Sequence, residues 1–253
     1  MTEYVISPDG LRIAFDDVGR GEPIVLVHGF GSDRTQNWRA PGWYETLLQS
    51  GRRVVAPDIR GHGESDKPRD PAAYAQDLRV SDVLAVMDAA GLKRTVVMGY
   101  SMGGYMAIHL AKRFGTRVDK LIVGGVGETY FRDRGNTLSG VAAALEVENP
   151  TTIEDPLGLM FRRFVDQKGK DRLALAACMR GSRTTFSPSQ LAEIPQKVLV
   201  VCGSADTLTG RPGPLAAAFP RGRSVTIERR DHMTSVGDKL YKQAVLEFLK
   251  EQD

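Results

Sequence analysis

Short apolar runs recur along the chain with the pattern of strands that are buried on both faces. They are rich in valine, isoleucine and leucine, as in the central strands of a parallel sheet. These runs occupy residues 23–28, 52–57, 94–99, 118–123, 197–202 and 224–227. Two further strands are predicted at residues 3–6 and 11–16, and the turn sequence Pro8-Asp9-Gly10 between them indicates a hairpin. The sequence therefore predicts a mostly parallel sheet with an antiparallel N-terminal edge.

Between the strand runs, apolar residues fall at helical spacing. This spacing predicts helices over residues 77–90, 102–114 and 238–250. In the last helix, the residues predicted to face the core are Leu240, Ala244, Val245, Phe248 and Leu249. The alternation of strands and helices favours right-handed crossovers, so the predicted fold class is α/β, with helices packed on a mostly parallel sheet.

Residues 127–195 break this alternation. Their apolar residues follow helical spacing at 138–147, 157–165 and 172–179, and no buried-strand run lies among them. We expect this segment to form a small helical cap, or lid, inserted into the fold. The predicted domains are then a core of residues 1–126 and 196–253 and a cap of residues 127–195.

Composition narrows the possible classes of protein. The chain has 253 residues, enough for one large α/β domain with an insertion, and its net charge of +3 is spread without a long basic run, which argues against a nucleic-acid partner. Its two cysteines, Cys178 and Cys202, cannot form a disulfide framework, so a reducing cytoplasm fits best. The N-terminus lacks the features of a secretion signal, and no long apolar run predicts a membrane span.

The most informative motif is Gly99-x-Ser101-x-Gly103, which joins a predicted strand to a predicted helix. A sharp strand-to-helix turn displays its serine above the sheet, and this turn needs neighbours without side chains. Ser101 is therefore the predicted nucleophile. A serine hydroxyl also needs a base, and that base needs an acid to orient it.

Four histidines are available as the base. His232 lies in the loop between the last strand and the last helix and is the predicted base. His28 ends a strand, His62 lies between two glycines, and His109 lies along the helix that follows Ser101. His28 and His62 are interpreted as structural, because geometry decides a catalytic role before residue type does. His109 lies about eight residues, or roughly 12 Å, along the helix from Ser101, which is too far for the base.

Three carboxylates compete for the role of the acid. Asp206 follows the strand at 197–202, so it emerges at the carboxyl edge where parallel sheets place their ligand sites. Glu128, after the strand at 118–123, and Asp231, beside His232, stay open as alternatives. Asp231 is the weakest candidate, because neighbouring residues in a chain rarely point at the same partner. Asp206 is preferred for its place at the end of the strand.

Several motifs resemble those of the α/β-hydrolases, over nearly the whole chain apart from the helical insertion. The segment His28-Gly29-Phe30-Gly31 is similar to the oxyanion loop of that family, and Gly99 to Gly103 is similar to its nucleophile elbow. Three further stretches follow in the order that is typical of the family. They are Asp58-Ile59-Arg60-Gly61-His62-Gly63-Glu64-Ser65, Gly203-x-x-Asp206 and Asp231-His232-Met233. The resemblance implies a three-layer α/β-hydrolase sandwich in which the backbone N–H groups of Phe30 and Met102 form the oxyanion hole.

The resemblance also implies a type of reaction. Family members that attack with aspartate, such as dehalogenases and epoxide hydrolases, are disfavoured, because this chain has Ser101 at that position. We expect a serine carboxylesterase-like hydrolase, without cofactor or metal, that cleaves esters of small to medium acyl chains through an acyl-enzyme. Lactonases, C–C bond hydrolases and cofactor-free haloperoxidases or perhydrolases stay open, as do a ligand receptor that retains the triad and a non-catalytic scaffold.

The substrate pocket is the least specified part of the prediction. Met160, Phe161, Phe164, Leu173 and Met179 lie at helical spacing in the cap and are candidates for an apolar roof. The residues expected to line the pocket are Trp38, Met160, Phe164, Met179 and Met233. The expected partner is a small-molecule ester, and the chain is expected to be a monomer or homodimer. The natural substrate and the mobility of the cap are not predicted.

Overall fold

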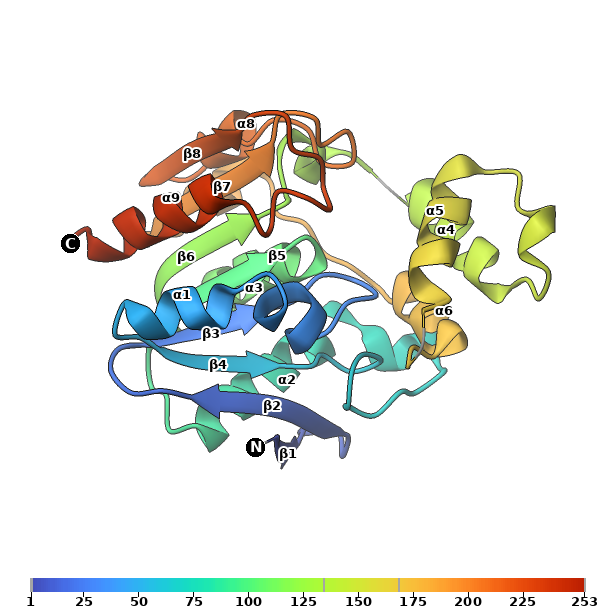
Figure 1. Ribbon diagram of the computed structural model, residues 1–253, viewed down its shortest axis with the longest axis horizontal. Helices are drawn as coiled ribbons and strands as arrows, with labels where there is room; N and C mark the ends of the chain where they lie inside the picture. Colours follow the sequence, from blue (N-terminus) through green and yellow to red (C-terminus); the bar gives the residue numbers. More distant parts are fainter. Residues whose placement is uncertain (1, 134, 168, 253) are drawn as a thin grey trace.

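The computed structural model describes residues 2–133, 135–167 and 169–252 of the chain, so the two ends of the predicted core domain, residues 1 and 253, lie outside it. An eight-stranded sheet runs through the centre in the order β1-β2-β4-β3-β5-β6-β7-β8 (Figure 1). The strands are β1 (Glu3–Ile6), β2 (Arg12–Val18), β3 (Pro23–Val27), β4 (Arg53–Pro57), β5 (Thr95–Tyr100), β6 (Val118–Gly124), β7 (Lys197–Gly203) and β8 (Gly222–Ile227).

Helices connect the strands and cover the sheet. The α-helices are α1 (Trp43–Gln49), α2 (Gln76–Ala89), α3 (Met102–Arg113), α4 (Gly135–Glu146), α5 (Pro156–Val165), α6 (Arg172–Arg180), α7 (Pro188–Leu191), α8 (Gly213–Ala216) and α9 (Lys239–Lys250). Shorter helical turns are η1 (Thr35–Arg39), η2 (Pro71–Tyr74), η3 (Gly115–Arg117), η4 (Glu128–Phe131) and η5 (Pro150–Thr152). Helix α1 separates η1 from β4 and is not among the elements that the sequence pattern predicts.

The sheet confirms the predicted fold class. β1 pairs with β2, and β2 with β4, in antiparallel register, whereas every pairing from β4 across to β8 is parallel. From β3 the chain moves outward to β4 and then returns to β5 on the other side of β3. Such a reversal opens a crevice at the carboxyl ends of β3 and β5, where open α/β sheets place their ligands.

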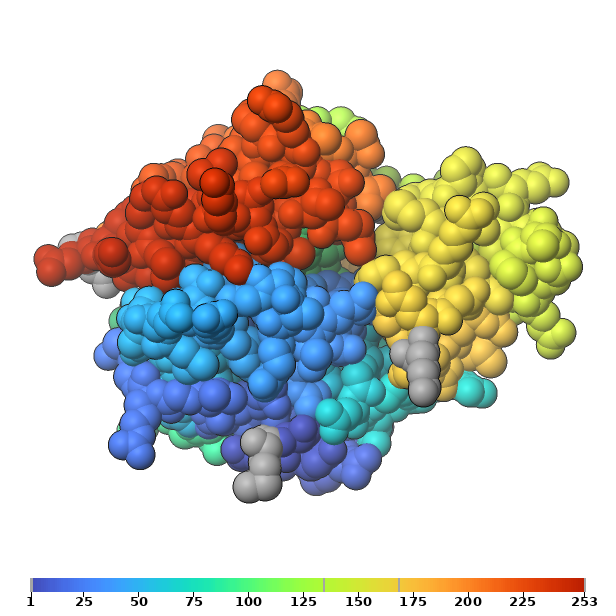
Figure 2. Space-filling view, in the orientation of Figure 1, coloured from blue at the N-terminus to red at the C-terminus, as the bar shows by residue number. Residues whose placement is uncertain are grey.

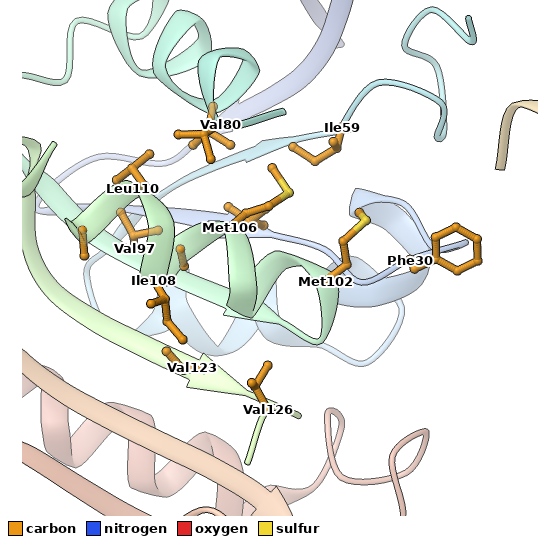
Figure 3. Close-up of a cluster of buried hydrophobic side chains, with 14 of the residues drawn as sticks. Phe30, Ile59, Val80, Val97, Met102, Met106, Ile108, Leu110, Val123 and Val126 are labelled. Atoms are coloured by element: carbon orange, nitrogen blue, oxygen red, sulfur yellow. The ribbon is translucent and has the colours of Figure 1, made fainter. Parts of the chain in front are cut away.

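Alternation of side chains along the strands produces the three layers. In β3, Val25 and Val27 belong to the core cluster on one face, and Ile24 and Leu26 belong to the cluster on the other. Figure 3 shows part of the first cluster, where Met106 and Leu110 of α3 lie over the strands. Helices α1 and α9 cover the opposite face (Figure 1).

Helix α9 differs from the prediction at one residue. Leu240, which the sequence pattern turns inward, is 49% exposed, and Tyr241 is buried instead, with its ring 5.2 Å from that of Trp43. The helix begins at Lys239 with Asp238 as its cap, and its buried stripe runs through Tyr241, Val245 and Phe248. Leu240 therefore lies one position, or about 100°, away from the buried stripe.

Helices α4, α5 and α6 form a lobe beyond the carboxyl edge of the sheet (Figures 1 and 2). No strand occurs in the described parts of residues 127–195. Tyr130, Phe186 and Leu191 from this segment are nevertheless buried in the main core cluster. The exact boundaries of the cap therefore stay a prediction.

Candidate active site

Ser101 lies on a strained turn between β5 and α3. Its φ of 52° and ψ of −116° are in a region that residues with side chains rarely adopt. A Cβ atom on Gly99 would lie 2.0 Å from the carbonyl oxygen of Gly103, and one on Gly103 would lie 2.0 Å from that of Val27. Only glycine fits at these two positions, which explains the Gly-x-Ser-x-Gly spacing.

Three side chains from separate loops meet at this turn. The Nε2 atom of His232 lies 3.0 Å from Oγ of Ser101, and its Nδ1 atom lies 2.8 Å from Oδ2 of Asp206. Ser101 follows β5, Asp206 follows β7, and His232 follows β8, so all three emerge at the carboxyl edge of the sheet. The structure thus brings together the three residues that the sequence predicts as nucleophile, acid and base.

Asp206 is buried and strongly hydrogen bonded. Its Oδ1 atom accepts hydrogen bonds from the backbone N–H groups of Leu208 at 3.0 Å and Thr209 at 3.1 Å. Burial alone would raise the pKa of Asp206, but the hydrogen bonds from His232 and Thr209 outweigh burial and lower it. An ionised Asp206 accepts a hydrogen bond from the Nδ1–H group of His232, which leaves Nε2 free to accept the hydroxyl proton of Ser101.

The two alternative acids have other partners. Oδ1 of Asp231 accepts hydrogen bonds from the backbone of Met233 and Thr234, within its own loop. Glu128 pairs with Nε of Arg211 at 3.2 Å. The hydrogen bond from His232 goes to Asp206 rather than to either of these carboxylates, so the geometry favours Asp206.

Tyr100 ties the strand that carries Ser101 to the loop that carries His232. Its hydroxyl donates a hydrogen bond to the carbonyl oxygen of His232 at 2.6 Å and lies 2.8 Å from Oγ of Ser235. Tyr100 is absent from the site residues predicted from the sequence. A signal was present, because a buried tyrosine directly before the serine needs a partner for its hydroxyl.

The other three histidines lie away from Ser101 and have separate contacts. His28 accepts a hydrogen bond from the N–H of Ile59 at 3.0 Å, and its ring lies 5.0 Å from that of His62. Burial lowers the pKa of both His28 and His62, which keeps them neutral. Nε2 of His109 lies 2.7 Å from Asp77 on α2.

A mostly apolar cavity of about 420 Å³ opens above Ser101 and His232. Its wall on the core side includes Phe30 and Met102, and Figure 3 shows Met102 at the start of α3. The side chains that line it from the cap and the loop after β8 include Leu138, Val141, Leu157, Met160, Phe161, Phe164, Met179 and Met233. Four of the five predicted pocket residues therefore reach the cavity.

Trp38 is the exception among the predicted pocket residues. It is 0% exposed and packs in the core cluster beneath the sheet, with its ring 6.1 Å from that of Trp43. The π-helical turn η1 directs Trp38 inward, and its neighbour Asn37 faces the cavity instead, where its Oδ1 atom accepts a hydrogen bond from Gly29 at 2.9 Å. Leu173, a candidate for the roof, is 37% exposed and does not line this cavity.

Metal ligands and membrane-spanning helices are both absent from the described part of the chain. In residues 2–133, 135–167 and 169–252, no group of three or more His, Cys, Asp or Glu side chains is placed to hold a metal ion. None of the helices in these ranges is both long enough and apolar enough to cross a membrane.

A serine, histidine and aspartate at the carboxyl edge of this sheet define the class of the α/β-hydrolases. Residues 24–238 match the alpha/beta hydrolase family, and the chain belongs to that family. It is 31% identical to the AB hydrolase superfamily protein YisY of Bacillus subtilis, in a match that covers 88% of this chain and 87% of that protein. It is 37% identical over 124 residues to a 2-hydroxymuconate semialdehyde hydrolase of a Pseudomonas species, in a match that covers 48% of this chain and 42% of the relative.

Solved structures agree with this membership. A hydrolase from Pseudomonas aeruginosa superposes with a TM-score of 0.82 at 26% identity, covering 99% of this chain and 98% of that one. A thermophilic esterase from Thermogutta terrifontis, with malate bound, superposes with a TM-score of 0.79 at 25% identity and the same coverage. The chain spans only 33% of the length of several mycobacterial relatives whose function is uncharacterized.

Proposed function

We propose that the protein is a serine hydrolase that cleaves carboxylic esters of small to medium acyl chains. The observation that carries this proposal is the hydrogen-bonded chain from Ser101 through His232 to Asp206, which ends in a cavity of about 420 Å³. This volume lies in the range of small-molecule sites, and apolar walls suit an acyl chain.

The first half of the reaction forms an acyl-enzyme. Oγ of Ser101 attacks the ester carbonyl carbon while Nε2 of His232 takes the hydroxyl proton. The ionised Asp206 stabilises the imidazolium that forms. His232 then gives its proton to the departing alcohol as the bond between the carbonyl carbon and the alcohol oxygen breaks.

The oxyanion is stabilised by backbone N–H groups in this proposal. Met102 is the first residue of α3, so its N–H group is among those without a partner one turn earlier in the helix. The loop of Phe30 lies against the nucleophile, since a Cβ atom on the adjacent Gly29 would lie 3.4 Å from that of Ser101. Each such donor contributes about 3 kcal/mol to stabilisation of the transition state.

Water completes the cycle. His232 takes a proton from a water molecule, the resulting hydroxide attacks the acyl carbon, and the proton returns to Oγ of Ser101 as the acid is released. The lobe of α4, α5 and α6 acts as a lid in this proposal, because its side chains supply about half of the apolar residues that line the cavity. A lid excludes bulk water and so strengthens the electrostatic contacts at the site.

The central test replaces the nucleophile. Ser101→Ala is expected to fold normally and to lower turnover of a p-nitrophenyl ester by about 10⁴-fold or more. It should also abolish labelling by a fluorophosphonate. Ser50→Ala is the matched control, because Ser50 lies at the end of α1 and its hydroxyl donates to the carbonyl of Leu47. Full turnover in Ser101→Ala would contradict the proposal. In the wild type, turnover that stops after one covalent event would favour a ligand receptor.

A C–C bond hydrolase is the second candidate. The observation that favours it is the similarity to 2-hydroxymuconate semialdehyde hydrolase over 48% of the chain. A panel of p-nitrophenyl esters of increasing chain length, run beside 2-hydroxymuconate semialdehyde, a lactone and a peracid-formation assay, distinguishes these activities. Ester cleavage with a kcat/KM about tenfold above the other substrates supports the esterase.

A further inference from the structure

A second cavity of about 520 Å³ adjoins the one above Ser101. We call it the arginine chamber. Both cavities are lined by Met102, Tyr105, Leu138, Met179 and Arg183, so these residues form the boundary between them. A substrate long enough to pass this boundary would have one end at Ser101 and the other in the arginine chamber.

The two cavities differ in charge. Among the described residues that line the cavity above Ser101, Arg183 is the one Asp, Glu, Lys or Arg side chain. The described lining of the arginine chamber contains Arg79, Arg132, Arg180 and Arg183 and one acid, Asp133. Arg132 pairs with Glu128 at 3.7 Å and Arg180 with Glu146 at 2.6 Å, so Arg79 and Arg183 carry the excess of positive charge. An excess of one sign of charge in a recess with low-dielectric walls concentrates ligands of the opposite sign.

Arg79 is the most unusual of these arginines because it is 0% exposed. Its Nη2 atom donates to Oε1 of Gln76 at 2.8 Å and to the carbonyl oxygen of Ser182 at 3.1 Å, and both acceptors are neutral. The nearby Asp82 is held at 2.7 Å and 2.8 Å by Arg60. Burial lowers the pKa of Arg79, as expected for a guanidinium without a carboxylate in contact.

Three buried donors in the lining have no hydrogen-bond partner within the described residues. They are Nε of Arg79, Nε2 of Gln76 and the hydroxyl of Tyr105. Buried donors are almost always satisfied in native proteins, so three of them among the residues that line one cavity point to an acceptor that binds there. A carboxylate supplies two oxygens that accept hydrogen bonds and a negative charge.

The backbone at this wall adds to the positive potential. Gln76 and Arg79 belong to the first turn of α2, a helix of 14 residues whose N-terminus has no side-chain cap. A helix N-terminus carries a partial positive charge, so an arginine in the first turn is unfavourable unless an anion offsets it. Asp77, in the same turn, is engaged by His109.

We propose that the arginine chamber binds the free carboxylate of substrates whose ester carbonyl lies at Ser101, so that the preferred substrates are half-esters of dicarboxylic acids. This inference rests on the proposed function, since it assigns the substrate class of the same site. Arg79, Arg183, Gln76 and Tyr105 are substrate-binding residues in it, and none of them takes part in bond breaking.

The test compares two 4-nitrophenyl esters of the same six-carbon diacid, one with a free carboxylate at its far end and one with that carboxylate masked as a methyl ester. Mono(4-nitrophenyl) adipate carries a free carboxylate, and methyl 4-nitrophenyl adipate carries a neutral ester at the same position. The wild type is expected to favour the anionic ester by about tenfold or more in kcat/KM. In Arg79→Gln this ratio should fall by about tenfold. The variant loses the charged contact with the carboxylate, so its kcat/KM falls more for the anionic ester than for the neutral one.

Three further variants keep the test decisive. Arg183→Gln should lower the same ratio, and it serves if Arg79→Gln does not fold. Arg79→Lys retains the charge and should recover part of the preference. Arg20→Gln removes one exposed positive charge between β2 and β3, far from the chamber, and should leave the ratio unchanged. An equal loss for both esters in Arg79→Gln would assign Arg79 a purely structural role and overturn the proposal.

A binding experiment separates this inference from the proposed function. Calorimetric titration of Ser101→Ala with adipate needs no turnover. Binding that weakens about tenfold when Arg79→Gln is added supports the chamber even if no ester is cleaved. Equal affinity in both proteins overturns the inference, as does a wild type that cleaves the neutral ester as well as the anionic one.

Discussion

The two sides of the cavity above Ser101 are built by different means. On the core side, Ser101, Asp206 and His232 are held by backbone contacts and buried hydrogen bonds, such as the one from Tyr100 to the carbonyl of His232. On the cap side, the wall consists largely of apolar side chains such as Met160 and Phe161, which are held by packing rather than by hydrogen bonds. In the proposed reaction, the core side therefore fixes the chemistry, and the cap side fixes the shape of the substrate that fits.

This difference predicts unequal tolerance to substitution. A change on the core side displaces reacting atoms, and a displacement of 1 Å costs about 10²-fold in rate. A change on the cap side alters a hydrophobic contact, which is worth about 10- to 200-fold in selectivity at most. Variants on each side test whether core-side substitutions mainly lower the rate and cap-side substitutions mainly change the selectivity.

Asp206→Asn should have the largest effect. The amide would present a donor to Nδ1 of His232 and favour the wrong tautomer, so kcat is expected to fall by about 10³- to 10⁴-fold. Steady-state kinetics with a p-nitrophenyl ester measures the loss. Asp231→Asn is the matched control, since Asp231 bonds only its own loop. A larger loss in Asp231→Asn would show that the acid is misassigned.

A pair of glycine variants compares backbone packing on the two sides. Gly103→Ala places a methyl group against the carbonyl of Val27 and should lower the free energy of unfolding by about 3 kcal/mol. Gly140 lies within α4 of the cap, and a Cβ atom added there would have no neighbour within 4 Å. Gly140→Ala should therefore raise the free energy of unfolding by about 0.5–1 kcal/mol. Urea unfolding measures both, and similar losses would contradict the comparison.

Phe161→Ala tests the cap wall directly. The ring of Phe161 lies 5.8 Å from that of Phe30 and closes one side of the cavity. Its removal should lower kcat/KM for a long acyl chain by about tenfold and change acetate hydrolysis less. Val147→Ala, at an exposed position after α4, is the control. Equal losses across all chain lengths would indicate that the cap influences the chemistry itself.

The smallest effects concern ion pairs. Arg60 holds the pKa of Asp9 at about 2 through two hydrogen bonds of 2.7 Å. A carboxyl whose pKa is lowered in the folded protein stabilises the fold at pH values above its pKa in the unfolded chain. This stabilisation is lost as the pH falls toward 2. Since a third of the Asp9 side chain is exposed and solvent screens it, Asp9→Asn should cost about 1 kcal/mol at pH 7.

This ion-pair prediction has an internal check and a counterpart in the cap. In urea unfolding, the difference between Asp9→Asn and the wild type should shrink as pH falls from about 4 to about 2. A constant difference would point to packing rather than charge. Arg69→Gln removes an exposed pair with Asp171 of the cap and should change stability by less than about 0.5 kcal/mol.

The sequence predicted the core side well because its constraints are local. The buried runs located the central strands, and the glycines around Ser101 reflect steric contacts within a few residues of the turn. His232 and Asp206 could be chosen because strand order brings the ends of β7 and β8 to the same edge. What remained open was whether Asp206 or a neighbouring acid reaches His232, which only side-chain geometry decides.

The remaining features depend on how separate segments pack. Trp38 and Asn37 are adjacent in sequence, and only the turn η1 determines which of them faces the cavity. Leu240 and Tyr241 differ in burial because the aromatic ring of Trp43 lies opposite Tyr241. The arginine chamber could not be predicted either, since Arg79 of α2 and Arg183 of the cap meet there from distant positions in the chain.

The hydrogen bond between Ser101 and His232 joins residues 131 positions apart. During synthesis on the ribosome, β5 and its serine emerge well before β7 and β8, which carry the acid and the base. A nascent or truncated chain that ends before β7 holds only an ordinary alcohol at residue 101. In the proposed mechanism, activation of Ser101 therefore depends on the last two strands of the sheet.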